Sequence, residues 1–126
     1  MATISFVDDH HAFRTVFGEI LRLQGHTVLE AGTTADVHHI VERHLGPIDL
    51  LVVEAMLTTT NGVEVARHLS DRYPGIPTLY ISEECAGHLS EHRELPPSAP
   101  FLRKPFAAED LCGKVEEVLR ARAVAH

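Results

Sequence analysis

Polar side chains follow several short apolar segments of the chain, and their types could support phosphate or metal chemistry. They are Asp8 and Asp9, Glu54, Ser82 and Lys104, each at the end of an apolar run. In an open parallel sheet, ligands bind outside the carboxyl ends of the strands, so these side chains would converge on one edge. That edge would hold carboxylates, a hydroxyl group and one lysine.

Three of these residues suit a hard cation. Carboxylate oxygens are the ligands that Mg²⁺ prefers in proteins, so Asp8, Asp9 and Glu54 are candidate metal ligands. A plainer alternative is that the Asp8-Asp9 pair only begins a loop and caps the next helix, where negative charge is favourable. Lys104 favours a site, because a lysine at the end of a buried strand can balance carboxylates that would otherwise raise one another's pKa.

The elements that must position these residues follow from alternating patterns along the chain. Short runs rich in β-branched residues alternate with helical patterns, which is typical of βαβ units and a parallel sheet. The predicted strands are Thr3–Val7, Thr27–Ala31, Leu50–Val53, Thr78–Ile81 and Ala99–Leu102. The pattern predicts an α/β fold, a (βα)5 doubly wound domain that spans residues 1–126 as a single unit.

Four of the intervening helices are predicted from apolar residues three and four positions apart. The first ends at Gly25, the second before Gly46-Pro47, and the third begins near the capping residue Asn61 and ends by Pro74. Their inward faces would carry Phe13, Val16, Phe17, Ile20 and Leu21; Val37, Ile40, Val41 and Leu45; Val65, Ala66 and Leu69; and, in the last helix, Leu111, Val115, Val118 and Leu119. The segment 83–93 is polar and precedes two prolines, so we expect a fourth helix that is short, mobile or irregular.

Charge and composition exclude several classes of function. The 126 residues carry a formal net charge of −7, which argues against binding to a nucleic-acid backbone. The chain has neither a signal peptide pattern nor an apolar run long enough for a membrane span. Cys85 and Cys112 lack a CxxC spacing and are predicted to be reduced thiols. We therefore expect a cytoplasmic protein with no nucleic-acid or membrane partner.

Taken together, the motifs resemble the receiver domain of two-component response regulators. The resemblance runs from Asp8-Asp9 through the segment 49–54 and Asn61-Gly62 to Ser82 and Lys104-Pro105-Phe106. It implies a flavodoxin-like three-layer sandwich with a five-stranded parallel sheet in the order 2-1-3-4-5. The segment 101–106 resembles the corresponding segment of receivers attached to hybrid histidine kinases more than that of receivers fused to DNA-binding domains.

The resemblance also implies a role for each site residue. Asp8 and Asp9 would hold Mg²⁺, with Glu54 and the backbone carbonyl of Met56 as further ligands. Glu54 occupies the phosphoacceptor position, where the family has aspartate. The phosphoryl group would be contacted by Ser82 and Lys104, and Phe101 matches the aromatic switch position.

Three positions depart from the family pattern. Glu54 places its carboxylate one methylene, roughly 1.5 Å, further from the backbone than aspartate would, and a shift of that order can cost about 100-fold in rate. Glu83 replaces a small residue beside the phosphodonor path, and Thr58 replaces a common proline. These changes predict an atypical receiver in which Glu54 is a phosphomimetic or is not phosphorylated, with weak Mg²⁺ binding.

The predicted function is therefore that of a phosphorelay signalling module and not of an enzyme, although typical receivers catalyse their own phosphorylation and dephosphorylation. Its partner would be a histidine kinase or a histidine phosphotransfer protein, with a homodimer through the fourth helix, fifth strand and last helix as a further possibility. Two alternatives stay open. One is a small phosphoryl-transfer hydrolase that uses a strand-end carboxylate, and the other is a plain binding domain.

Overall fold

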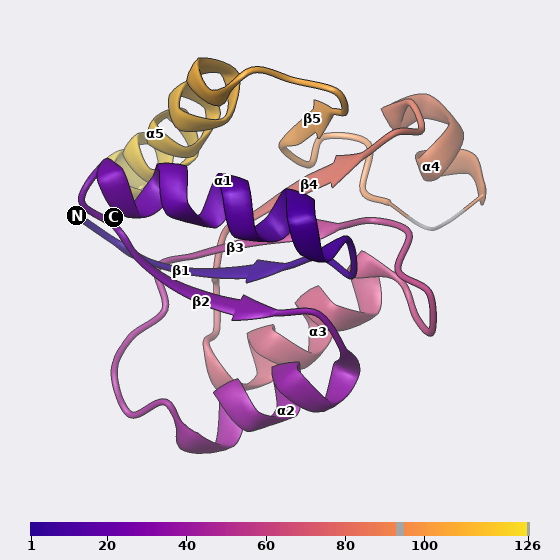
Figure 1. Ribbon diagram of the computed structural model, residues 1–126. Coiled ribbons are helices and arrows are strands. Elements are labelled where there is room, and N and C mark those ends of the chain that lie inside the picture. The colour runs from indigo at the N-terminus through magenta and orange to yellow at the C-terminus, as the bar shows by residue number, and fades with distance from the viewer. Residues whose placement is uncertain (93–94, 126) are drawn as a thin grey trace.

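The computed structural model describes residues 1–92 and 95–125, and within them a five-stranded parallel sheet carries helices on both faces (Figure 1). The strands are β1 (Thr3–Val7), β2 (Thr27–Ala31), β3 (Leu50–Glu54), β4 (Thr78–Ser82) and β5 (Phe101–Arg103). The helices are α1 (His11–Leu23), α2 (Thr34–Arg43), α3 (Gly62–Arg72), α4 (Ala86–His92) and α5 (Ala108–Ala125). The strand order β2-β1-β3-β4-β5 confirms the predicted flavodoxin-like fold.

Two separate hydrophobic clusters lie on the two faces of the sheet. Alternate residues of a strand point to opposite faces, so β3 sends Leu50 and Val52 into one cluster and Leu51 and Val53 into the other. In Figure 1, α1 and α5 cover the first face, and α2 and α3 cover the second. Because β3 lies at the centre of the sheet, it is buried on both faces along its whole length.

Local sequence signals set the ends of several helices, and those at Asn61 and Gly25 were predicted. The Asn61 side chain caps α3 by accepting a hydrogen bond of 2.9 Å from the backbone N–H of Glu64, and Thr33 caps α2 in the same way. Gly25 has a positive φ of 96° just after α1, a conformation that glycine adopts without strain. These residues fix the starts of α2 and α3 and the end of α1.

Several predicted boundaries and burial assignments need correction. β3 and β4 each run one residue further, because Glu54 and Ser82 still pair with the neighbouring strand. The fifth strand is shorter and lies later than Ala99–Leu102. Val16 is 56% exposed although it shares the spacing of the buried residues of α1, and Leu45 is 92% exposed because it lies beyond the end of α2.

The fourth helix is short, as predicted, with seven residues in α4. The inward residues of the last helix, Leu111, Val115 and Val118, are buried in the cluster that α1 also covers. Among the described residues, no helix combines the length and the apolar character that a membrane crossing requires.

Candidate functional site

Lys104 joins two of the predicted site residues at the carboxyl edge of the sheet. Its Nζ lies 2.9 Å from Oδ2 of Asp8 and 3.0 Å from Oε1 of Glu54. Asp8 follows β1, Glu54 ends β3 and Lys104 follows β5, so the strand topology brings together residues that are up to 96 positions apart. All three side chains are buried, and the lysine balances two carboxylates that would otherwise repel each other.

Burial and hydrogen bonding act in opposite directions on the charge of Lys104. Burial alone would lower the pKa of the ammonium group, but the hydrogen bonds from Lys104 to Asp8 and Glu54 outweigh burial and raise its pKa above the ordinary value. Lys104 is therefore fully charged at neutral pH. Each carboxylate also accepts one backbone N–H, from His10 to Asp8 at 2.9 Å and from Met56 to Glu54 at 3.1 Å.

Asp9 points away from this cluster and toward the loop between β3 and α3. Its Oδ2 accepts a hydrogen bond of 2.7 Å from the backbone N–H of Thr58 and a second from the Thr58 hydroxyl group. Burial would raise the pKa of Asp9, but the Thr58 hydrogen bonds hold it below the usual range. Asp9 is thus bound by Thr58, whereas Asp8 and Glu54 are bound by Lys104, although Asp9 and Glu54 line the same pocket.

Ser82 lies at the end of β4 and lines the same pocket as Glu54. Its hydroxyl oxygen accepts a hydrogen bond of 3.2 Å from the backbone N–H of Glu84. The pocket has a volume of about 400 Å³ and is also lined by Asp9, Met56 and the exposed Glu83. An incoming anion would therefore meet four carboxylates here, those of Asp9, Glu54, Glu83 and Glu84, and Lys104 already has two carboxylate partners.

Sequence reasoning missed three residues that hold this site. The Phe13 ring lies 4.1 Å from the Lys104 ammonium, measured to the ring centre. Arg14 donates a hydrogen bond of 2.6 Å to the backbone carbonyl of Asp8. The third is Thr58. The spacing of apolar residues predicted only that Phe13 lies on the inward face of the first helix. The contacts of Arg14 and Thr58 depend on side-chain length and on loop conformation, which the spacing does not give.

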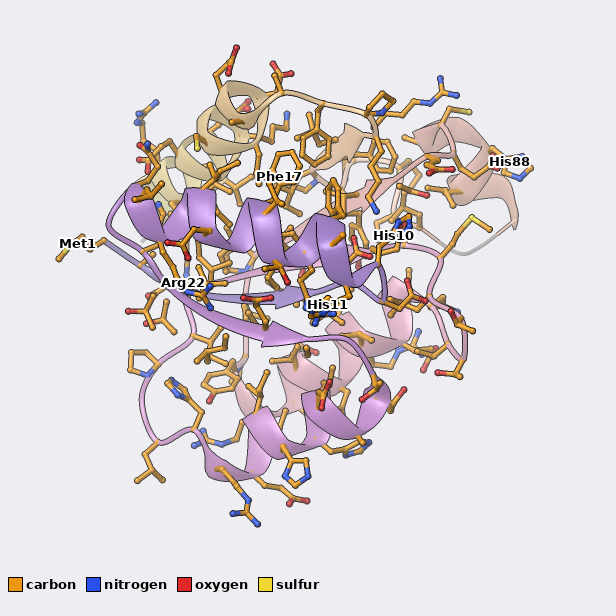
Figure 2. The ribbon with its side chains drawn as sticks, in the orientation of Figure 1. Met1, His10, His11, Phe17, Arg22 and His88 are labelled. Carbon is orange, nitrogen blue, oxygen red and sulfur yellow. The ribbon has the colours of Figure 1, made fainter. Side chains whose placement is uncertain are left out.

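The side chains at the start of α1 frame the open side of the site. Figure 2 shows His10 and His11 at the end of α1 that lies at the carboxyl edge of the sheet, and Arg22 at the opposite end of the helix. Glu30 on β2 accepts from Arg14 at 3.2 Å and from Arg22 at 2.9 Å. This pair of ion pairs fixes α1 on the sheet and so fixes the backbone that leads into Asp8.

The donors are of the right type for Mg²⁺, but their arrangement does not fit a bound cation. Asp8 and Glu54 bind Lys104, and Asp9 binds Thr58. Within the described part of the chain, no group of three or more His, Cys, Asp or Glu side chains is placed to hold a metal ion. Weak Mg²⁺ binding at Asp8, Asp9, Glu54 and the Met56 carbonyl stays a prediction that this arrangement does not favour.

Phe101, the predicted switch residue, lies on β5 and packs partly buried against the cluster on the α2 and α3 side of the sheet. It also lines a groove of about 690 Å³ beside α5, together with Lys114 and Val118. Phe101 therefore lies next to the surface that the sequence predicted for association.

Comparison with known proteins places the chain among signalling domains. A family model described as "Response regulator receiver domain" matches residues 4–116. Sensor kinase CckA of Brucella abortus (strain 2308) is 30% identical over 120 residues, which are 94% of this chain and 12% of CckA. Response regulator receiver protein CpdR of the same organism is 25% identical over 121 residues, which cover 96% of this chain and 99% of CpdR.

Solved structures agree with the family match. The crystal structure of the receiver domain from hybrid histidine kinase CckA is 28% identical, with a TM-score of 0.75 over 93% of this chain and 98% of that one. A CheY-like response regulator receiver domain protein from Methanospirillum hungatei JF-1 has the same fold, with a TM-score of 0.84, 22% identity and coverage of 100% and 99%. The chain belongs to the response regulator receiver domain family of two-component signalling.

Proposed function

We propose that this receiver domain acts as a fixed-state partner of a histidine kinase or histidine phosphotransfer protein, with Glu54 in place of the phosphorylated aspartate. The observation that carries the proposal is the buried contact of 3.0 Å between Glu54 Oε1 and Lys104 Nζ. Both carboxylate oxygens of Glu54 are engaged, one by Lys104 and the other by the backbone N–H of Met56. A nucleophile held in this way attacks an incoming phosphoryl group poorly.

Glu54 is a partial mimic of a phosphorylated residue. It supplies one negative charge and two acceptor oxygens, whereas a phosphoryl group carries about −1.5 to −2 charges and three acceptor oxygens. It engages Lys104, but Ser82 binds the backbone of Glu84 instead. Only one of the two expected phosphoryl contacts is present, so we expect the domain to be biased only modestly toward the activated state.

Glu83 adds a second obstacle to phosphorylation. It is exposed on the wall of the pocket that also contains Glu54 and Ser82. A carboxylate at this point repels an anionic phosphodonor. The paired state of Glu54 also gives no support to the alternative of a small hydrolase, which would need the same carboxylate as a free nucleophile.

Receiver domains typically bind Mg²⁺ at their acidic pocket, where the cation supplies neutralising charge to phosphoryl transfer. The function proposed here requires neither phosphoryl transfer nor a bound Mg²⁺ ion. Under this proposal the chain is not an enzyme, residues 1–126 act as one receiver domain, and its output is binding. The chain spans 99% of the length of CpdR but 12% of that of CckA.

The test is labelling by acetyl phosphate in the presence of Mg²⁺, followed by intact-mass measurement. We expect no phosphoryl adduct on the unmodified chain and labelling of Glu54→Asp, because the shorter side chain moves the nucleophile away from Lys104. If Glu83 is the larger obstacle, only Glu54→Asp combined with Glu83→Ala will be labelled. Glu54→Gln is the control for labelling elsewhere, and efficient labelling of Glu54 itself would overturn the proposal.

A further inference from the structure

We propose that Thr58 acts as an internal substitute for a divalent cation. Its backbone N–H and hydroxyl group bind the Asp9 carboxylate and take the place of a metal ion there. The basis is the pair of hydrogen bonds from the Thr58 backbone N–H and hydroxyl group to a single oxygen, Oδ2 of Asp9. This inference rests on the proposed function, because it explains how a receiver with Glu54 keeps its acidic residues stable without a metal ion.

Asp9 is the carboxylate for which a cation would compete most directly. Asp8 and Glu54 are buried against Lys104, whereas Asp9 is exposed to solvent at the mouth of the pocket. A cation reaching Asp9 must displace two donors from Oδ2. Hydrogen bonds to a charged acceptor are about twice as strong as neutral ones, so this displacement has a substantial cost.

The loop that carries Thr58 is held in place on both sides. Met56 forms an isolated antiparallel bridge with Asn61, and the backbone N–H of Gly62 donates to the carbonyl of Ala55 at 2.9 Å. The loop thus returns on itself directly after β3, with Thr58 at its outer part. Asp9 is held toward this loop by its two hydrogen bonds from Thr58.

The residue type at position 58 decides whether this contact can form. Threonine supplies both a backbone N–H and a hydroxyl group. Proline, the residue that the family resemblance leads one to expect here, supplies neither of them. A receiver with proline at this position would leave the same Asp9 oxygen without these two donors.

The test is a calorimetric titration of MgCl₂ into the unphosphorylated wild-type chain, Thr58→Val and Thr58→Pro, supported by the shift of the melting temperature with MgCl₂. Thr58→Val removes only the hydroxyl donor, and Thr58→Pro removes both donors. We expect Thr58→Val to raise the Mg²⁺ affinity roughly tenfold, as the loss of one hydrogen bond to a charged group implies, and Thr58→Pro to raise it further. Thr59→Val is the matched control, because Thr59 is exposed in the same loop, whereas the hydrogen bonds that Asp9 Oδ2 accepts from this loop, among the described residues, come from Thr58.

A second arm shows whether any gain passes through Asp9. Adding Asp9→Asn to Thr58→Val should abolish the increase in affinity. Equal affinities in the three proteins, including no detectable binding in any of them, would overturn the inference, as would a gain that survives Asp9→Asn. The titration uses no phosphodonor, so its outcome does not depend on whether Glu54 can be phosphorylated. Phosphorylation of wild-type Glu54 would refute the proposed function, whereas the Mg²⁺ affinities alone decide the role of Thr58.

Discussion

The ammonium group of Lys104 lies over the face of the Phe13 ring, 4.1 Å from its centre. The face of an aromatic ring attracts cations, so Lys104 is held by a π surface on one side and by carboxylates on the other. Phe13 is itself fixed by other rings, with centres 4.6 Å away at Phe17 and 5.6 Å away at Phe106. The apolar packing beneath α1 therefore helps to determine the position of the cation that binds both Asp8 and Glu54.

Replacing Phe13 with leucine should loosen Lys104 without removing the apolar side chain. We expect the free energy of unfolding to fall by about 1–2 kcal/mol through loss of the cation–π contact and of ring packing. Urea denaturation measures the change. A double-mutant cycle with Lys104→Met isolates the contact between the two residues, and a coupling energy near zero would show that Phe13 acts only by packing.

Lys104→Met should be among the most destabilising single changes in the chain. It leaves Asp8 and Glu54 buried without their cation, for which the expected loss is about 3–5 kcal/mol. Lys114→Met is the matched control, because Lys114 pairs with Glu117 on the surface of α5 at 3.2 Å and such pairs contribute about 0–1 kcal/mol. Equal losses in the two variants, measured by urea denaturation, would contradict the structural role given to Lys104.

The stabilising effect of Lys104 should persist well into the alkaline range. Burial lowers its pKa, but hydrogen bonds with Asp8 and Glu54 raise the pKa of the folded state above the ordinary value. A raised pKa in the folded state gives stability that is fully present below the pKa of the unfolded chain, about 10.4, and is lost as pH rises through the folded value. We expect the difference in urea midpoint between wild type and Lys104→Met to be equal at neutral pH and at about pH 9, and to shrink only above about pH 10.4. A difference that falls already between these first two pH values would mean that Lys104 is not held in its charged form.

Gly62 is required where α3 passes close to the end of β3. A Cβ atom at this position would lie 2.7 Å from the backbone carbonyl oxygen of Glu54. Gly62→Ala should therefore lower the free energy of unfolding by about 1–3 kcal/mol, because backbone must move to accept the methyl group. Gly113→Ala, in the open interior of α5, should instead raise it by up to about 1 kcal/mol. Thermal melting distinguishes the two signs, and a stabilising Gly62→Ala would contradict the contact.

Two surfaces are candidates for partner binding. Phe101→Ala or charge reversal at Arg103 should weaken binding to a kinase or self-association if the α4, β5 and α5 surface is used. Both variants should still fold, although Phe101→Ala should melt at a lower temperature because Phe101 packs against a core cluster. Arg103 is exposed and donates a hydrogen bond of 2.9 Å to the backbone carbonyl of Glu83, which couples this surface to the pocket. Light scattering and calorimetry with a histidine phosphotransfer protein measure the two kinds of association.

The α1 surface provides the opposing test. Val16 and Leu23 are 56% and 77% exposed on this helix, and neither takes part in the ion pairs that join α1 to β2. If association survives the changes at Phe101 and Arg103 but is lost in Val16→Glu, α1 is the docking surface. That result would show that the aromatic switch position does not control binding in this chain.

The sequence predicted the strand-end residues because topology alone brings them to one edge. β1 and β2 have the predicted bounds, since β-branched residues and clear flanking turns define them. β3 and β4 extend by one polar residue each. Strand pairing uses backbone groups, so the polarity of a side chain does not prevent its residue from ending a strand. Glu54 therefore has two roles: its backbone pairs with β4, and its side chain binds Lys104.

The orientation of the loop residues was not predictable in the same way. Asp9 was expected to join Asp8, but its hydrogen-bond donors belong to Thr58, which lies 49 positions further along the chain. Val16 has the spacing of a buried residue, yet no element of the described chain covers it. Such outcomes depend on which groups a folded loop or neighbouring helix brings within reach, and spacing along the sequence does not contain that information.

β5 also limits how copies of the domain can meet. It is three residues long, lies at the outer edge of the sheet, and is bracketed by Pro100 and Pro105, neither of which can donate a backbone hydrogen bond. Short strands, flanking prolines and an exposed arginine such as Arg103 are features by which proteins keep edge strands from recruiting strands of another molecule. This edge therefore offers few backbone groups for pairing with a strand of another molecule, which disfavours cross-β aggregation.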